Sequence, residues 1–338
     1  MSNQLPIGKL DPRLLEKIVF NYLGSERKEV LIGPKVGVDA ALLQINNTRI
    51  VFKSDPIVGA SHRIGQLAIN VVSNDIACMG AKPIAVTLVI LLPENSNINT
   101  IEQIMREADI AAKNIGVAIV GGHTEIAAGL KDRPPIVIAS AIGTLVSNFI
   151  VSASNALPGD YILMTKTAGL EGTVIIAETM QNKLLKIIDQ KTIKQAQNMI
   201  NNTSILKEAL ALAERNLVNA MHDPTDGGVL EGLYEMSQAS GIGLIVYEDK
   251  IPIAPETKVI SDYLKIDPIK LISSGVLLAA IRPEKLDEAI RILNSLGIQT
   301  AVIGQFTKKN DPVKIIKKDG KTVHITEPVI DELWKLIT

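Results

Sequence analysis

Acidic residues recur among small residues at four places in the first part of the chain. They are Asp39 within Gly37–Ala41, Asp55 within Ser54–Pro56, Asp75 within Ser73–Pro83, and Glu125 after Gly121–His123. Apolar sequence surrounds each of them, and a carboxylate in apolar surroundings is unfavourable unless it is paired or binds a cation. The Mg²⁺ that accompanies nucleotide phosphates prefers a few carboxylate oxygens together with water and phosphate. The pattern therefore predicts a magnesium site in an enzyme that uses a nucleotide.

Asp75 is the carboxylate that is hardest to explain as part of a local turn. Asp39 follows a glycine and Asp55 precedes a proline, so each could simply stabilise a turn, although both are candidate metal ligands. Asp75 lies instead beside Asn74 among Ile, Val and Met residues, where an unpaired carboxylate would be unfavourable. We therefore expect Asp75 to be catalytic and to bind metal, with Asn74 contacting the cofactor.

A second polar cluster begins where an apolar stretch ends in two glycines, Gly121 and Gly122. His123 follows them and could face a ligand or take part in a structural hydrogen-bond network. Thr124 and Glu125 add a hydroxyl and a carboxylate beside backbone amides, a combination that can bind phosphate and metal together. We expect a catalytic role for His123 and cofactor contacts for the other four residues.

The sequence His222–Gly228 repeats this chemistry in the second half of the chain. Asp226 can cap the helix that follows, and the N-terminus of that helix would attract phosphate. Capping could also be the whole role of Asp226. The cofactor-binding candidates from this segment are Asp223, Thr225, Asp226 and Gly227.

Hydrophobic periodicity indicates the elements that would position these residues. Helical spacing covers Leu14–Leu23, His62–Met79 and Ile98–Ile115, and apolar β-branched runs at Arg49–Lys53, Ile84–Leu92 and Val117–Val120 predict strands. Asp75 would then lie near the end of a helix, and Gly121–Gly122 would form a turn after a strand. A helix, a strand, a glycine turn and a polar cluster form a plausible ligand-binding order.

The sequence Leu157–Asp160 marks a turn, where we place a boundary between domains 1–155 and 156–338. Beyond it we expect helices within Thr173–Met180, Lys191–Glu214, Asp226–Ala239 and Glu284–Leu296, strands at Tyr161–Thr165, Leu244–Tyr247, Gly275–Ile281 and Thr300–Gly304, and a hairpin at Lys314–Ile325. Mixed helices and strands predict an α/β (α+β) chain of two domains.

Composition narrows the class of function. The 338 residues are 46% hydrophobic but only 3% aromatic, which suits α/β layers with aliphatic cores. A formal net charge of -1 argues against nucleic acid or an acidic membrane as partner and favours a small-molecule acceptor. The uncharged stretch Pro134–Gly159 is read as two buried strands with a loop, because Ser, Asn, Gly and Pro interrupt it. The single Cys78 and the absence of a leader pattern make the cytoplasm the expected compartment.

Taken in order, these segments resemble the AIR synthase (PurM-like) superfamily over nearly the whole chain. Val38-Asp39-Ala40-Ala41 is similar to that family's Asp-Asp-Ala-Ala, Ser54-Asp55 to its Thr-Asp, and Asn74–Pro83 to its Asn-Asp-Leu-Ala-Met-Met-Gly-Ala-x-Pro. In the second half, Asp223–Gly228 and Asp267–Leu271 are most similar to the HypE-like members, which are hydrogenase-maturation proteins.

The resemblance implies a two-domain PurM-like fold and a homodimer. The N-terminal domain would carry a mixed sheet that pairs with a second subunit, and ATP and Mg²⁺ would bind between subunits or domains. Asp39, Asp55 and Asp75 would bind metal and phosphate, with Gly121–Gly122 beside them. The implied activity is transfer of the ATP γ-phosphate to an amide, carbonyl or other oxygen of an unknown small acceptor, with cations offsetting the charge on the phosphoryl group.

Three departures from the family pattern leave alternatives open. Val38 replaces the first Asp of the Asp-Asp pair, His123 stands where many members carry Asp or Glu, and Asp331–Thr338 has no cysteine to carry a carbamoyl group. One alternative is a thiamine-monophosphate kinase, which Ala85–Leu88 fits. The other is a non-catalytic nucleotide-binding protein that acts on a maturation partner or in regulation.

Overall fold

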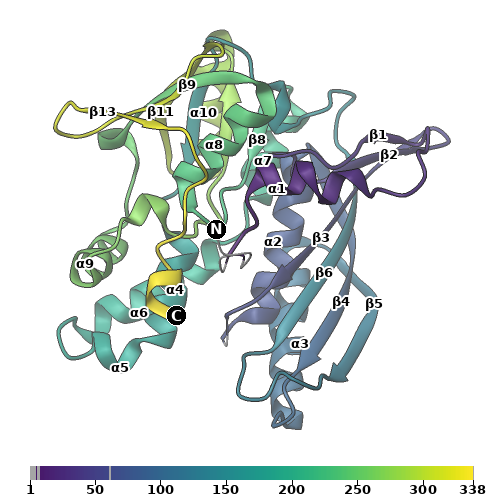
Figure 1. The fold of residues 1–338 in the computed structure, drawn as a ribbon, viewed down its shortest axis with the longest axis vertical. Coiled ribbons are helices and arrows are strands. Elements are labelled where there is room, and N and C mark those ends of the chain that lie inside the picture. The colour runs from purple at the N-terminus through teal and green to yellow at the C-terminus, as the bar shows by residue number, and fades with distance from the viewer. Residues whose placement is uncertain (1–4, 6–7, 61, 338) are drawn as a thin grey trace.

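The computed structural model describes residues 5, 8–60 and 62–337, which form two sheets with helices packed on them (Figure 1). The first sheet has the strand order β1-β2-β3-β6-β4-β5, with β4 and β5 parallel and the other neighbours antiparallel. Its strands are β1 (Val30–Ile32), β2 (Ala41–Ile45), β3 (Thr48–Ile57), β4 (Ala81–Leu92), β5 (Ala118–Ile126) and β6 (Ile136–Leu145). The helices of this part are α1 (Pro12–Lys17), α2 (Ile64–Cys78) and α3 (Ile98–Ile115). The mixed sheet of the expected α/β fold is confirmed.

The second sheet has the order β13-β12-β9-β11-β7-β10-β8. Its strands are β7 (Tyr161–Thr165), β8 (Ala220–His222), β9 (Ile242–Tyr247), β10 (Leu278–Ile281), β11 (Thr300–Lys309), β12 (Val313–Ile316) and β13 (Thr322–Ile325). The helices of this part are α4 (Leu170–Thr179), α5 (Gln181–Leu184), α6 (Gln190–Asn198), α7 (Leu206–Glu214), α8 (Gly228–Ser240), α9 (Pro255–Leu264), α10 (Leu286–Ser295) and α11 (Trp334–Ile337). The hairpin expected near Asp319 is present as β12 and β13.

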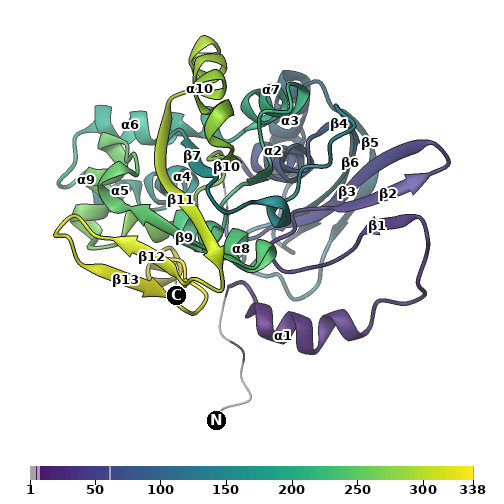
Figure 2. The same cartoon turned by 90° about the horizontal axis from the view of Figure 1, so that it is seen from above.

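Helix α2 lies where the two domains meet (Figure 2). It packs on β3, β4 and β6 on one side, on α3 on another, and on α7 and β8 of the second domain. Every residue of α2 except Gln66 is therefore buried. Gly65 allows the close approach of α3, because a Cβ at that position would lie 2.1 Å from the Ile104 carbonyl oxygen. A helix enclosed on all sides explains why Asp75 is surrounded by apolar residues in the sequence.

The two faces of the first sheet differ. The face toward α2 is buried, whereas the opposite face exposes large apolar side chains, including Phe52 (43% exposed) and Ile142 (40%), which are paired across β3 and β6. An antiparallel sheet with one solvent-facing side normally alternates apolar and polar residues. The apolar outward positions are thus typical of a surface that binds another protein.

Three local predictions were wrong. Gly121 and Gly122 do not form a turn but lie inside β5, which continues to Ile126. Residues 134–159 contain one strand, β6, rather than two, and a 3₁₀ turn at Ala153–Asn155 precedes the second domain. The predicted helix Leu14–Leu23 ends at Lys17 and is followed by a 3₁₀ turn. Among the described residues, no helix combines the length and apolar character needed to cross a bilayer.

Candidate active site

A lysine and two aspartates form the first part of the site, on β3 and α2. Side chains alternate along a strand, so Val51, Lys53, Asp55 and Ile57 all point toward α2. The Lys53 ammonium lies 3.5 Å from Asp55 Oδ1 and 3.3 Å from Asp75 Oδ1 on α2. Two of the three predicted metal ligands are therefore held around one ammonium group.

The second part of the site joins the two domains. His222, the last residue of β8, has Nδ1 at 2.5 Å from Asp39 Oδ1 and Nε2 at 2.9 Å from Glu235 Oε2 on α8. The Lys9 ammonium lies 2.5 Å from the other oxygen of Glu235. Because both ring nitrogens face carboxylates, the arrangement favours the doubly protonated, positively charged form of His222. The predicted ligand Asp39 is thereby fixed against the second domain.

Three carboxylate oxygens of this centre have no hydrogen-bond partner within the described part of the chain. They are Asp39 Oδ2, Asp75 Oδ2 and Asp223 Oδ2, all buried. The three residues, together with Lys53 and Asp55, line a cavity of about 210 Å³ between the domains. Unpartnered carboxylate oxygens are the donors that Mg²⁺ selects. Asp39, Asp223 and His222 offer ligand atoms that all lie within 4.8 Å of one another, and Asp75 is not part of that group, so Asp39 and Asp223 fit the predicted metal. The imidazole of His222 is less suitable, since both of its nitrogens are already engaged.

Burial and mutual repulsion shift the protonation of these groups. Burial, reinforced by Asp39, raises the pKa of Asp223 to about 7. Burial also raises the pKa of Asp75 well above its ordinary range, although Lys53 opposes this shift. For His222, burial would lower the pKa, but the contacts with Asp39 and Glu235 outweigh it and raise the pKa. A nearby cation would favour the charged carboxylates, so the centre is electrostatically suited to bind one.

A second cavity of about 450 Å³ adjoins the first, and Lys9, Asp55 and Thr225 line both. Besides Asp55, its wall includes apolar side chains and three further carboxyl groups, those of Glu171, Asp226 and Asp331. Burial raises the pKa of Glu171 to about 7, and its Oε2 has no hydrogen-bond partner among the described residues. The two connected cavities provide room for phosphates beside the acidic centre and for a larger organic group next to them.

The N-terminus of α8 differs from the sequence-based expectation. Asp226 does not cap the helix; its carboxylate accepts hydrogen bonds from the Lys9 backbone N–H and the Trp334 indole. The Gly227 N–H instead donates to Asp331 Oδ2 at 2.7 Å. The N-cap residue of α8 is Gly227, and no side chain of the described residues caps the helix, because the Asp226 carboxylate is engaged by Lys9 and Trp334 instead.

The predicted cluster on β5 is not brought to the acidic centre of the same chain. The strand pairing aligns Asp55 with Ala139, Leu88 and Gly122 in one lateral row, and Pro56 with Ile138, Val89 and His123 in the next. His123 therefore belongs to the outward face of the sheet, three strand spacings or about 14 Å from β3. Its Nε2 lies 2.9 Å from Glu125 Oε2, and both side chains are exposed. Thr124 lies between them on the same strand.

The Asn74 side chain contacts the segment before α7 rather than the acidic centre. The amide donates to the Thr203 carbonyl at 2.9 Å and accepts from the Ile205 N–H at 3.0 Å, which ties α2 to that segment. Both ends of the amide are thus engaged between the domains, in contrast to Asp75 next to it.

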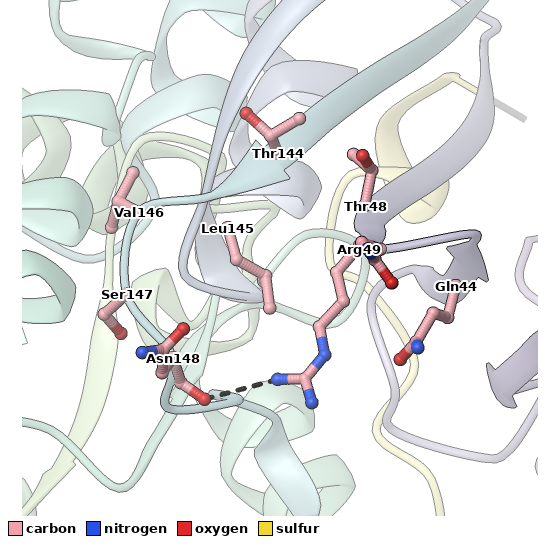
Figure 3. Close-up of a pocket in the computed structure, with 9 residues that line it drawn as sticks. Gln44, Thr48, Arg49, Thr144, Leu145, Val146, Ser147 and Asn148 are labelled. Atoms are coloured by element: carbon pink, nitrogen blue, oxygen red, sulfur yellow. Dashed lines mark hydrogen bonds between the residues drawn. The ribbon is translucent and has the colours of Figure 1, made fainter.

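A cavity of about 720 Å³ lies apart from this centre at the ends of β2, β3 and β6 (Figure 3). Arg49 is the charged residue in its wall, and the guanidinium donates to the Asn148 carbonyl at 3.4 Å. The remaining lining residues are uncharged. A wall without carboxylates offers no acidic ligands for a divalent cation, so we favour the smaller acidic cavity as the active site.

Sequence reasoning missed the cations and one anion of the centre: Lys9, Lys53, His222 and Glu235. For Lys53 a signal existed, since it precedes Asp55 by two residues and therefore shares its face of the strand. Lys9 and Glu235 reach the centre only through long-range packing.

Comparison with known proteins agrees with this architecture. Residues 37–145 match the family model of the AIR synthase related protein N-terminal domain, and residues 158–317 match that of the C-terminal domain. A putative hydrogenase expression/formation protein of Methanocaldococcus jannaschii is 30% identical over 336 residues, 96% of each chain. This chain belongs to the AIR synthase-related family.

Other family members are named for hydrogenase maturation. The carbamoyl dehydratase HypE of Rhizobium leguminosarum bv. viciae is 24% identical over 80% of this chain and 77% of its own. A solved HypE–HypF complex is similar with a TM-score of 0.73 and 25% identity, covering 93% of this chain and 99% of that chain. A structure of HypE in complex with ATP has a TM-score of 0.72 at 20% identity, with 93% of each chain covered, and shows the shared fold.

Proposed function

We propose that this protein is an ATP- and Mg²⁺-dependent, HypE-like enzyme that phosphorylates an amide, carbonyl or other oxygen of a small acceptor. The observation that carries the proposal is the set of three buried, unpartnered carboxylate oxygens around the cavity between the domains. Relatives named carbamoyl dehydratase and a HypE structure with ATP support the same activity.

In this proposal the residues of the chain have distinct roles. Asp39 and Asp223 would hold Mg²⁺, and Asp55 and Asp75, in contact with Lys53, complete the charged wall of the cavity. Mg²⁺, when bound, would offset the negative charge of the phosphates. The γ-phosphorus would gain a bond to the acceptor oxygen as its bond to the bridging oxygen of ADP breaks. The protein would contribute mainly by positioning both molecules in the connected cavities.

We further propose that His123 acts only when a second copy covers the outward face of the first sheet. His123 and Glu125 lie in the outward row, on the same side of the sheet as the exposed apolar residues Phe52 and Ile142. In a homodimer, the polar cluster Gly121–Glu125 would then lie at the subunit boundary and could contact a nucleotide there. A maturation protein is a candidate partner, since a HypE relative is known in complex with HypF. A cytoplasmic location stays a prediction.

The test is ATP hydrolysis by the purified protein with Mg²⁺ in the presence of a panel of carbamoyl, amide and carbonyl compounds. We expect one compound to stimulate release of ADP, and Asp75→Asn to abolish the stimulation. Asp109→Asn, on the exposed surface of α3, is the matched control and should behave as the wild type. Failure of the wild type to bind ATP in the presence of Mg²⁺ would end the proposal.

A further inference from the structure

Lys53 occupies an unusual position for a lysine. It points from β3 toward the buried helix α2, between the inward apolar residues Val51 and Ile57. A charge in such a place is unfavourable unless it is paired, and here two carboxylates, Asp55 and Asp75, flank the ammonium. The lysine side chain is therefore part of the acidic centre rather than of the surrounding surface.

The cations of the centre are divided between two groups of carboxylates. Lys9 and His222 contact Asp39 and Glu235, whereas Lys53 is the cation in contact with Asp55 and Asp75. Lys35 also lines the cavity, but its ammonium donates to the Ala239 carbonyl. Without Lys53, Asp55 and Asp75 would have no cation in contact with them among the described residues.

Lys53 does not engage every carboxylate oxygen of the centre. Lys53 contacts Oδ1 of Asp75, while Oδ2 of Asp75 is left without a hydrogen bond, as are Oδ2 of Asp39 and Oδ2 of Asp223. The ammonium is a compact point charge with three donors, so it can face two carboxylates and still offer a donor to a phosphate oxygen in the cavity.

We propose that the Lys53 ammonium takes the place of one divalent cation beside Asp55 and Asp75, so that this chain binds its nucleotide with a single divalent ion held by Asp39 and Asp223. The inference rests on the proposed function, because it assumes that the cavity binds a nucleotide with a metal. Lys53 then positions the carboxylates and contacts the nucleotide phosphates directly.

The test counts metal ions rather than turnover. Mn²⁺ binding is measured by electron paramagnetic resonance in the presence of a non-hydrolysable ATP analogue, for the wild type, Lys53→Met, Lys53→Arg and the surface control Lys113→Met. Methionine replaces the unbranched aliphatic part of the lysine side chain and removes the charged ammonium group. Lys113 pairs with Asp109 on the exposed face of α3 and lies outside the site.

We expect one bound Mn²⁺ per chain for the wild type, Lys53→Arg and Lys113→Met, and two for Lys53→Met. Thermal unfolding of the same samples should show that Mn²⁺ raises the melting temperature of Lys53→Met more than that of the wild type. Two or more Mn²⁺ ions bound to the wild type would overturn the role assigned to Lys53, and so would a folded Lys53→Met variant that still binds one. Either result would leave the proposed function standing. A wild type that binds neither the analogue nor Mn²⁺ would overturn the proposed function together with this inference.

Discussion

His222 Nδ1 lies 2.5 Å from Asp39 Oδ1, and this contact joins the end of β8 in the second domain to the loop before β2 in the first. The other ring nitrogen faces Glu235 on α8. One imidazolium thus holds a proposed metal ligand in place and links the two domains that enclose the cavity. The position of Asp39 depends on the docking of the domains as much as on its own loop.

Replacing His222 with Gln should lower the free energy of unfolding by about 3–5 kcal/mol, because Asp39 and Glu235 would remain buried without the cation between them. Denaturant unfolding of both proteins measures the difference. The raised pKa of His222 means that its stabilising contribution is complete below its ordinary value of 6.5 and is lost as the pH rises through the folded-state pKa. The difference between the two proteins should therefore shrink above neutral pH; a difference that stays constant up to about pH 9 would contradict the imidazolium bridge.

The affinity for divalent cations should rise with pH around neutrality. Burial and Asp39 raise the pKa of Asp223 from 3.8 to about 7 in the folded protein, so a proton competes with the metal below that pH. For the same reason, without metal, the contribution of Asp223 to stability falls as the pH rises from 3.8 to about 7. Calorimetric titration with Mn²⁺ at pH 6 and at about pH 8 should show tighter binding at the higher value.

The variant Asp223→Asn is the control for this pH dependence. It should bind Mn²⁺ weakly at both pH values, because the titrating carboxylate is absent. An equal pH dependence in the variant and the wild type would show that another group is responsible.

Much of the fold followed from the sequence where the signal was local. The periodic segment Ile98–Ile115 is α3 with the predicted bounds, and His62–Met79 contains α2 with Asp75 in its last turns. The features that the sequence did not predict depend on contacts between residues that are far apart in the sequence. Lys9 reaches Glu235 only when the N-terminal segment packs on α8. The face occupied by His123 depends on the register of β5, which no local pattern specifies.

The glycine pair Gly121-Gly122 of β5 is a sequence pattern that predicted the wrong local structure. The pair predicted a turn, but Gly122 is needed within the strand, because a Cβ there would lie 1.8 Å from the Leu88 carbonyl oxygen and its φ is 150°. We expect Gly122→Ala to lower the free energy of unfolding by about 1–3 kcal/mol, as other overpacked sites do. Gly121→Ala is the matched control: a Cβ there meets nothing within 4 Å, so denaturant unfolding should show little change. Equal effects of the two substitutions would contradict the pairing of β4 with β5.

The homodimer can be tested through Phe52 and Ile142, which face each other across β3 and β6 on the outward face. Light scattering coupled to size exclusion should give a dimer for the wild type. Charged substitutions on this face, Phe52→Glu with Ile142→Glu, should give a folded monomer because the apolar contact would have to bury two carboxylates from each subunit. Ile110→Glu, at an exposed position of α3, should remain dimeric. A dimer that survives the double substitution would place the interface elsewhere.

The central claim is that folding brings the carboxylates of Asp39 and Asp223 together to bind a divalent ion, in a cavity that Asp75 and Lys53 also line, beside a nucleotide. The most direct measurement is a crystal structure grown with Mn²⁺ and a non-hydrolysable ATP analogue, with the metal located by its anomalous scattering. We predict a peak between the Asp39 and Asp223 carboxylates, with the phosphates of the analogue in the cavity next to Lys53. Metal and nucleotide bound at another surface, with these carboxylates unchanged, would contradict the account.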